Sequence, residues 1–275
     1  MIEIPESLVI AQQVQRTLGG KRIAGVIAGH SPHKNAWFAG DPGNYPGLLS
    51  GKQISGAKGL GSMVEIHAQS TILLVGDGIN LRYHPQGERI PNRHQLLVTF
   101  EDGDSLSATV QMYGGVWCFA KGTFENPYYL TATQSPSPLL EEFSHTFFQE
   151  KIQDPAAQKL SLKGFLATGQ RIPGLGNGVL QDILFQARLH PRRKVSSLSP
   201  EETNRLFSSL KNTLEQMVQM GGRDTEKDLF GKPGGYPTKM SKKTVGTPCP
   251  ECGETIVKES YMGGSVYFCP SCQKR

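Results

Sequence analysis

The sequence lacks the long apolar runs that would place it in a membrane. Its longest uncharged apolar stretch lies near Thr71–Val75, far short of the ~20 residues that a membrane-spanning helix needs. The first residues also lack the basic segment and apolar stretch of a secretory signal, because Glu3 and Glu6 stand where such a segment would be basic. We therefore expect a soluble chain that stays in the cytoplasm.

Repeats and low-complexity tracts are absent as well, and a composition of 37% hydrophobic and 19% charged residues excludes wholesale disorder. A chain of 275 residues can bury a real core and form two domains, or one domain with an appendage. Glycine and proline are plentiful, with 32 and 18 residues. Their abundance favours many turns and hence a β-rich part.

The first part of the chain lacks an excess of either charge. Residues 1–130 carry 10 Lys/Arg and 10 Asp/Glu, so the net charge of +5 arises entirely in the remainder. Basic residues concentrate in 155–200 and in 229–275, with seven in each stretch against one and three acidic residues. Such concentrations are the footprint expected for a polyanion partner, although a solvated surface better explains any one run taken alone.

One helix followed by short strands is expected over the first 130 residues. Leu8, Ala11, Val14 and Leu18 recur at helical spacing, and Gly19 supplies the stop. The short β-like runs that follow have turn clusters between them and no intervening helix, which is typical of a sandwich or barrel. The runs are Arg22–Ala28, Ser62–His67, Thr71–Val75, Gln95–Phe100, Ser105–Val110 and Val116–Phe119.

Beyond Thr131–Pro138, which looks like a linker, the periodicity becomes helical. The strongest start signal is a capping box, with Ser199 as N-cap, Pro200 at the first helical position and Glu202 three residues after the cap. That helix is expected to end at Met220. The other expected elements are helices over Leu139–Lys151, Ala156–Leu166 and Asn177–Leu189, and a loop over 231–247.

Four of the five cysteines fall in the last 27 residues with the spacing C-x2-C-x16-C-x2-C: Cys249, Cys252, Cys269 and Cys272. Two residues between ligands let both thiolates of a knuckle face one ion, and two knuckles on facing hairpins complete a tetrahedral Zn²⁺ site. Two disulfides are the alternative, which an intracellular chain disfavours. The pattern predicts one structural zinc that supplies much of the folding energy of this small segment. Cys118 lies in an apolar run and is expected to be buried packing.

A glycine-rich turn between basic helices is a candidate phosphate site. The sequence Pro173-Gly174-Leu175-Gly176-Asn177 places two glycines at a tight turn just before a helix, whose free N–H groups attract anions. The side chain of Asn177 can add a further donor. Lys163 and the cluster Arg192–Lys194 would add salt-sensitive affinity for a phosphate backbone. An ordinary helix–turn–helix connection is the alternative.

These parts, in this order, resemble the formamidopyrimidine-DNA glycosylase/endonuclease VIII family of base-excision repair enzymes. The segment GQRIPGLGNGVLQDILF resembles the family's helix–two-turn–helix motif, and the ending CPSCQ resembles its zinc finger. The start MIEIPE is similar to the family's M-P-E-L-P-E, and Lys58 in SGAKGLGSMVEIH sits where the family carries a strand lysine.

The resemblance implies an α+β multidomain fold with three parts. These are a β-sandwich catalytic-type domain with a leading helix over 1–130, a helix–two-turn–helix DNA-binding domain over 131–230, and a zinc ribbon over 231–275. It implies a monomer that binds double-stranded DNA containing a damaged base or an abasic site. The target base must leave the stack, so the site is expected in a cleft between the two domains.

The resemblance also implies the chemistry. The chain's N-terminal amine would attack C1′ of the damaged nucleoside, expel the base and form a Schiff base, and elimination would then cut the strand. Glu3 would be the acid or base beside the amine, Glu6 would orient the terminus, and Lys58 would be a donor to the sugar or phosphate. The plainer alternatives are helix-start carboxylates for Glu3 and Glu6 and a surface lysine for Lys58.

Two departures fall on positions that matter for this chemistry. Ile2 stands where the family has proline after Met1, and its bulk is expected to hinder removal of Met1. A retained Met1 displaces the amine by ~3.5 Å. This displacement is expected to slow the reaction, because one near 1 Å can already cost ~100-fold in rate. Gly264 stands where the family's finger carries an arginine that grips phosphate.

A third departure concerns the side chains that fill the space of the extruded base. The family uses a Met, an Arg and a Phe, whereas the corresponding regions here read Gly76-Asp77-Gly78 and Val110–Gly114, with a register ambiguous by one residue. No arginine is present in either register, and Tyr113 or Met112 is expected to intercalate instead. His94 matches a family backbone contact, or is a surface or packing histidine.

Two functions remain open on the sequence alone. The first is a DNA glycosylase with abasic-site lyase activity, favoured by the presence of Glu3, Glu6 and Lys58. The second is a paralogue that binds damaged or distorted DNA without cleaving it, favoured by Ile2 and Gly264.

Overall fold

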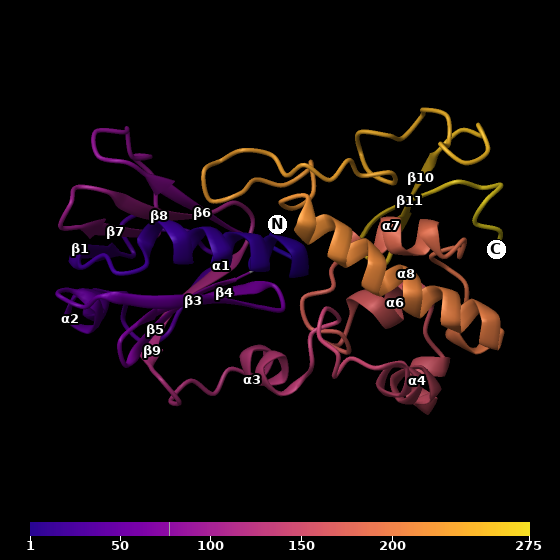
Figure 1. Cartoon of the computed structure of the whole chain (residues 1–275), viewed down its shortest axis with the longest axis horizontal. Helices are drawn as coiled ribbons and strands as arrows, with labels where there is room; N and C mark the ends of the chain where they lie inside the picture. Colours follow the sequence, from indigo (N-terminus) through magenta and orange to yellow (C-terminus); the bar gives the residue numbers. More distant parts are fainter. Residues whose placement is uncertain (77) are drawn as a thin grey trace. The chain divides into compact units, whose positions relative to one another are not determined.

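The computed structural model describes residues 1–76 and 78–275, and this part of the chain divides into two compact units (Figure 1). Unit 1 comprises Met1–Leu130 and Gly221–Gly235, and unit 2 comprises Thr131–Met220 and Tyr236–Arg275. The segment Gly221–Gly235 thus belongs to unit 1, although it follows the helices of unit 2 in the sequence. The three-part division expected from the sequence stays a prediction.

Unit 1 is the two-sheet β-sandwich that the strand pattern predicted. One sheet has the strand order β1-β7-β8-β6, and the other has the order β2-β9-β5-β4-β3. Neighbouring strands pair antiparallel, except that β2 runs parallel to β9. The strands are β1 (Ile23–Ala28), β2 (Ala36–Phe38), β3 (Ile54–Leu60), β4 (Met63–Ala68), β5 (Thr71–Gly76), β6 (Ile79–His84), β7 (Leu96–Phe100), β8 (Ser105–Val110) and β9 (Gly114–Ala120).

The helix α1 (Ile4–Leu18) shares one apolar core with both sheets (Figure 1). The helix ends at Leu18, just before the predicted stop at Gly19, and near its start the carboxylate of Glu6 accepts a hydrogen bond from the backbone N–H of Glu3 at 3.2 Å. Gly59 on β3 allows the helix to pack closely, because a Cβ at this position would lie 2.8 Å from the backbone nitrogen of Leu8. This close packing fixes the start of the chain against the second sheet.

Four elements of unit 1 escaped the sequence patterns: β2, β3, β6 and the short helix α2 (Tyr45–Leu49), which follows the 3-10 turn η1 (Pro42–Asn44). Gly56 and Gly59 weaken the strand signal of β3. The strand β2 has three residues and pairs with β9, far along the chain. The helix α2 has five residues, which is too short for a periodic pattern.

Unit 2 carries most of the helices, and the structure corrects several expected boundaries. The long helix α8 confirms the capping box at Ser199 and ends at Gln219. The stretch Thr131–Pro138 is not a plain linker, because α3 continues to Gln134. The helices are α3 (Pro127–Gln134), α4 (His145–Gln153), α5 (Pro155–Gln158), α6 (Leu162–Ala167), α7 (Val179–Gln186) and α8 (Pro200–Gln219), with the 3-10 turn η2 (Val195–Ser197).

Local helix caps explain the remaining differences between the expected and the observed helix boundaries. Ser161 caps α6 by accepting a hydrogen bond from the backbone N–H of Gly164, so the expected helix over Ala156–Leu166 is two short helices. Ser144 caps α4 in the same way, so this helix starts later than the predicted Leu139. No helix in the described part of the chain is long and apolar enough to cross a membrane.

The end of unit 2 is a two-stranded hairpin of β10 (Val257–Tyr261) and β11 (Gly264–Phe268). Its turn uses Met262 and Gly263, both in the left-handed region with φ of 48° and 71°. The four C-terminal cysteines flank this hairpin, as expected for a ribbon.

Candidate functional site

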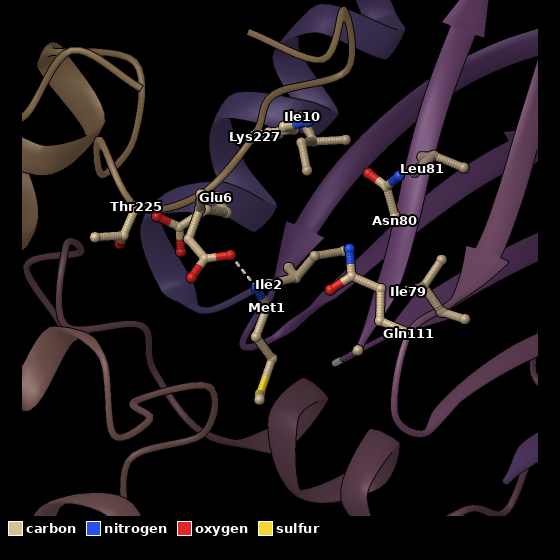
Figure 2. Close-up of a pocket in the computed structure, with 12 residues that line it drawn as sticks. Met1, Ile2, Glu6, Ile10, Ile79, Asn80, Leu81, Gln111, Thr225 and Lys227 are labelled. Carbon is tan, nitrogen blue, oxygen red and sulfur yellow. Dashed lines mark hydrogen bonds and ion pairs between the residues drawn. The ribbon is translucent and has the colours of Figure 1, made fainter. Parts of the chain in front are cut away.

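A pocket of about 150 Å³ opens in unit 1 beside the start of the chain. Met1 and Ile2 contribute to its lining, together with strand residues of β6 and the segment after α8. Figure 2 shows Asn80 and Gln111 entering from the strand side, and Thr225 on the side of that later segment. The polar side chains that line the pocket belong to Glu6, Asn80, Gln111, Thr225, Glu226 and Lys227.

The α-amine of Met1 lies in this pocket and forms an ion pair with the carboxylate of Glu226, drawn as the dashed line in Figure 2. The two side chains are 45% and 25% exposed, so water reaches the pair. The hydroxyl of Tyr113 donates to the sulfur of Met1 at 3.6 Å, and a guanidinium nitrogen of Arg223 donates to the Met1 carbonyl at 3.4 Å. The first residue is therefore held from three directions.

Ile2 anchors the start of the chain. Its side chain is only 4% exposed and belongs to the apolar core of the sandwich. The residue that departs from the family's proline therefore has a packing role, and in this structure the amine is carried by Met1, one residue before it.

Glu3 and Glu6 are buried, and both face Arg223, which is 1% exposed. The guanidinium of Arg223 binds Glu6 through two atoms, with Nε–Oε1 of 2.9 Å and Nη2–Oε2 of 2.6 Å, and its Nη1 lies 3.5 Å from Oε1 of Glu3. Burial alone would raise the pKa of Glu6, but the charge and hydrogen bonds of Arg223 outweigh it and hold this pKa below its ordinary value. Glu6 therefore acts on the terminus through Arg223, which in turn contacts the Met1 carbonyl.

Lys58 lies exposed on β3, opposite Glu65 of β4 in the strand register. Lys58 is not one of the described residues that line the pocket around Met1. Its predicted contact with a sugar or phosphate stays a prediction.

The residues expected to fill the space of an extruded base are partly described. Met112 is 65% exposed, and Tyr113 lies with its ring 6.0 Å from that of Trp37 and contacts Met1. Asp77, in the other expected region, lies outside the described residues. Tyr113 thus lies beside the first residue, and the insertion of Tyr113 or Met112 into a duplex stays a prediction.

His94 is buried, with 6% exposure. Its Nδ1 lies 2.9 Å from the carbonyl of Pro91, and its ring stacks on His30 with centroids 4.7 Å apart. This environment is that of a packing histidine, and its DNA contact stays a prediction.

In unit 2, the glycine-rich turn forms a tight bend before α7. Gly174 has a φ of 80°, which a glycine adopts readily, and the helix begins at Val179, two residues later than expected. The carbonyl of Gly176 accepts a hydrogen bond from the backbone N–H of Leu180 at 3.3 Å. The side-chain amide of Asn177 donates to the carbonyl of Ser265 in the hairpin at 3.0 Å. The turn and the hairpin are thus held together.

Lys163 meets the same hairpin from α6. It is 4% exposed, its ammonium donates to the carbonyl of Tyr261 at 2.5 Å, and burial lowers its pKa. A Cβ at Gly264 would lie 3.3 Å from Nζ of Lys163 and 3.6 Å from the amide nitrogen of Asn177. The structure therefore brings Lys163, Asn177 and Gly264 together, and the glycine lets the two polar groups lie close to the hairpin backbone.

The four cysteines converge on one point. The sulfur atoms of Cys249, Cys252, Cys269 and Cys272 all lie within 4.8 Å of one another, with separations of 3.9 Å and 3.4 Å for two of the pairs. Tetrahedral coordination with Zn–S bonds of ~2.3 Å puts sulfur atoms ~3.8 Å apart. The cluster can therefore hold one metal ion. The strand residue Cys118 is buried in the sandwich core, as predicted.

Sequence reasoning missed Arg223 and Glu226. Both lie in a stretch of loop-forming residues with no periodicity, and their partners, Glu6 and Met1, are more than 200 residues away. The sequence GGRDTEKD, which follows a long helix, contains several charged residues in a segment that otherwise resembles a turn. This run of charges is the one feature that could have pointed to Arg223 and Glu226. Such a run is usually a solvated surface, so the signal is weak.

Comparison with known proteins supports this architecture. A family model of the formamidopyrimidine-DNA glycosylase H2TH domain matches residues 135–228. The formamidopyrimidine-DNA glycosylase of Bacillus cereus is 28% identical over 284 residues, covering 100% of both chains. That of Hydrogenovibrio crunogenus is 28% identical over 282 residues, covering 100% of this chain and 97% of that protein.

Solved structures show the same fold. The MutM (Fpg) protein of Thermus thermophilus matches with a TM-score of 0.82 at 24% identity, covering 98% of both chains. The Lactococcus lactis Fpg (MutM), solved in a complex with DNA that contains N7-benzyl-Fapy-dG, matches with a TM-score of 0.85 at 22% identity. That match covers 99% of this chain and 100% of the other.

A β-sandwich with a leading helix, a helical H2TH module and a four-cysteine hairpin define the class of protein. Over its whole length the chain is similar to formamidopyrimidine-DNA glycosylases, and the model of their H2TH domain matches residues 135–228.

Proposed function

We propose that the protein is a base-excision-repair DNA glycosylase with abasic-site lyase activity. The observation that carries the proposal is the pocket of unit 1, in which a primary amine at the start of the chain lies beside acidic side chains. Relatives of the same length bear the name of that activity. Such work on DNA would place the enzyme in the cytoplasm.

The amine suits the reaction for a physical reason. An α-amine titrates near ~7.7–8.0, so a useful fraction is neutral and nucleophilic near neutral pH, unlike a lysine. It would attack C1′ of the damaged nucleoside and leave a Schiff base after the base departs. Glu3 would serve as the acid or base, and Glu6 would orient the terminus through Arg223. Lys58 would donate to the sugar or phosphate.

Unit 2 would grip the DNA. It carries the excess of basic residues, and its turn presents Gly176 and Asn177 before α7, next to Lys163 and the hairpin. The substrate would be double-stranded DNA with a damaged base or an abasic site, as in the complexes of the Lactococcus lactis Fpg. Tyr113 and His94 would contact the same duplex.

The four cysteines would hold one structural Zn²⁺. Four sulfur ligands at tetrahedral spacing suit zinc, and they leave no open position for a substrate. When bound, the ion supplies folding energy and fixes the hairpin. Through Gln181, whose carboxamide oxygen accepts from the backbone N–H of Tyr267 at 3.0 Å, the hairpin is also fixed against α7.

Borohydride trapping on a duplex with one abasic site tests the proposal. A Schiff base between the amine and C1′ is reduced to a stable adduct, so we expect a covalent protein–DNA band. Peptide mass spectrometry should map the link to the first residue and not to Lys58 or Lys227. No adduct at any pH from 6 to 9, with tight DNA binding retained, would instead establish a protein that binds damaged DNA without cleaving it.

A further inference from the structure

The proposed reaction leaves Glu226 without a role, although its carboxylate contacts the amine. The two acidic residues to which the reaction gives roles are engaged elsewhere. Glu6 binds Arg223 through two atoms, and the nearest guanidinium nitrogen to Glu3 lies 3.5 Å away. Glu226 is therefore the carboxylate that the structure presents to the amine of Met1.

The backbone holds Glu226 in place. Its N–H donates to the carbonyl of Arg223 at 3.1 Å, and its carbonyl accepts from the N–H of Gly234 at 3.2 Å. A Cβ at Gly234 would lie 2.2 Å from the backbone of Gly222, so the two ends of the segment pack without space for a side chain. Arg223 links this closed segment to α1 through Glu6. The position of Glu226 is thus set by the fold and not by the ion pair alone.

We infer that Glu226 is the positioning residue of the reactive amine: it fixes the nitrogen of Met1 in the pocket. The role in catalysis rests on the proposed function, whereas the contact itself does not. Holding the nitrogen in one place matters, because a displacement near 1 Å can cost ~100-fold in rate.

Other charged groups lie around the ion pair of Met1 and Glu226. Arg223 is the nearest cation besides the amine, and Lys227 lines the same pocket. Glu6 lines the pocket too, and its charge is balanced by Arg223. Arg223 also lies 3.5 Å from the carboxylate of Glu3.

From the strands, Asn80 and Gln111 contribute uncharged amides, and the phenol of Tyr113 touches the Met1 sulfur. Glu226 is thus the group in this pocket whose removal changes the charge that touches the amine.

The chemical steps balance without any co-reactant. The ammonium loses a proton to water or buffer and the neutral nitrogen bonds to C1′, while the bond from C1′ to the base breaks and the departing base takes its electron pair and a proton. One of the two remaining N–H protons then passes to O4′ as the sugar ring opens, which leaves the iminium. Glu226 holds the nitrogen throughout and is not consumed.

The first experiment needs no DNA. Intact mass establishes that Met1 is the first residue, and pulse acetylation with acetic anhydride at a single pH then gives the acetylation rate of the N-terminal amine by peptide mass spectrometry. We expect the amine of Glu226→Gln to react roughly 2- to 5-fold faster than that of the parent, because it is no longer held against a carboxylate. Glu150→Gln, which changes an exposed glutamate on α4 in unit 2, is the matched control and should leave the acetylation rate unchanged.

The second experiment measures the rate of trapping and the affinity separately, at saturating abasic duplex and by anisotropy. In Glu226→Gln the trapping rate should drop by at least ~10-fold while the affinity for the duplex stays unchanged, because the nitrogen is no longer held. Glu226→Asp should give a rate between those of the parent and Glu226→Gln, since its charge is retained on a shorter side chain.

Equal acetylation rates in the parent and Glu226→Gln would overturn the inference, as would an intact mass that lacks Met1. A faster acetylation in Glu226→Gln with no adduct in the parent would support Glu226 as the residue that holds the amine and refute the lyase function. The two proposals therefore fail separately.

Discussion

Arg223 is the residue that joins the two buried carboxylates of unit 1 to the start of the chain. A guanidinium with 1% exposure is costly to bury, and it is retained because Glu6 binds it through two atoms and Glu3 lies close by. Removing it would leave two carboxylates buried without a cation. It also connects the start of α1 to the segment that carries Glu226.

We predict that Arg223→Met lowers the free energy of unfolding of unit 1 by roughly 3 to 5 kcal/mol at pH 7. Urea unfolding followed by tryptophan fluorescence measures this, because both tryptophans, Trp37 and Trp117, lie in unit 1. Arg22→Met is the control, since Arg22 and Glu101 form an exposed pair at 3.8 Å. It should cost less than about 1 kcal/mol.

The pH dependence of that difference has a defined sign. In the parent, the pKa of Glu6 lies below its ordinary value, so its contribution to stability is present above that value and is lost as the pH falls through the lowered one. In Arg223→Met the guanidinium is lost, and burial, the largest influence on the pKa of Glu6, is opposed only by the backbone N–H groups of Glu3 and residue 223. The pKa of Glu6 therefore rises, and the variant gains stability as the pH falls. The difference in free energy of unfolding between the parent and Arg223→Met should become smaller from pH 7 to pH 5. A difference that does not change with pH would contradict this role of Arg223.

Among single residues, the sequence singles out those that can be recognised from their near neighbours in the chain. Glu3, Glu6 and the four cysteines could be singled out by their spacing or their place at a helix start. Arg223 and Glu226 could not, because their meaning comes from contacts with residues over 200 positions away. The amine contact of Glu226 in particular depends on the return of Gly221–Gly235 to unit 1.

Among the elements, the hairpin of β10 and β11 and the turn before α7 form one assembly. Asn177 and Gln181 both donate to the carbonyl of Ser265, at 3.0 and 3.2 Å, and Lys163 binds the carbonyl of Tyr261. The turn that would hold a phosphate is therefore positioned partly by the hairpin.

We predict that Asn177→Ala weakens binding to an abasic-site duplex by about 3- to 10-fold, the effect of one lost hydrogen bond. The metal content should not change, because the cysteines are untouched. Fluorescence anisotropy over a salt titration measures the affinity. A variant that binds as tightly as the parent at every salt concentration would remove Asn177 from the DNA interface.

Loss of the metal should act on the same assembly. We expect Cys252→Ala to lower the bound zinc, measured by atomic emission, from about one ion per chain to a small fraction, and to weaken duplex binding as the hairpin loosens. Cys118→Ala is the matched control, since this cysteine lies in the core of unit 1 and should leave the zinc content unchanged. Equal zinc in both variants would exclude a four-cysteine site.

Element boundaries followed the sequence where the signal was a cap. The box at Ser199, Pro200 and Glu202 gave the start of α8 correctly. Where glycine weakened a strand, as at Gly56 and Gly59 in β3, or where a serine cap divided a helical pattern, as at Ser161, the periodicity alone misled.

At the scale of the whole molecule, the sequence predicted the kinds of parts and their order along the chain. It could not predict the strand order of either sheet, because pairs such as β1–β7 and β2–β9 join segments with no local signal for one another. Nor did it predict that unit 1 is discontinuous, since nothing in the composition of Gly221–Gly235 shows where it packs.

That discontinuity limits how the protein can be divided. A polypeptide that stops at Leu130 would keep Glu3 and Glu6 but lose the arginine that neutralises them and the side chain that holds the terminus. The first 130 residues are therefore not a self-sufficient folding piece. A shortened version would need residues 221–235 joined directly after Leu130. It would then contain every segment of unit 1, including the one that contacts Met1.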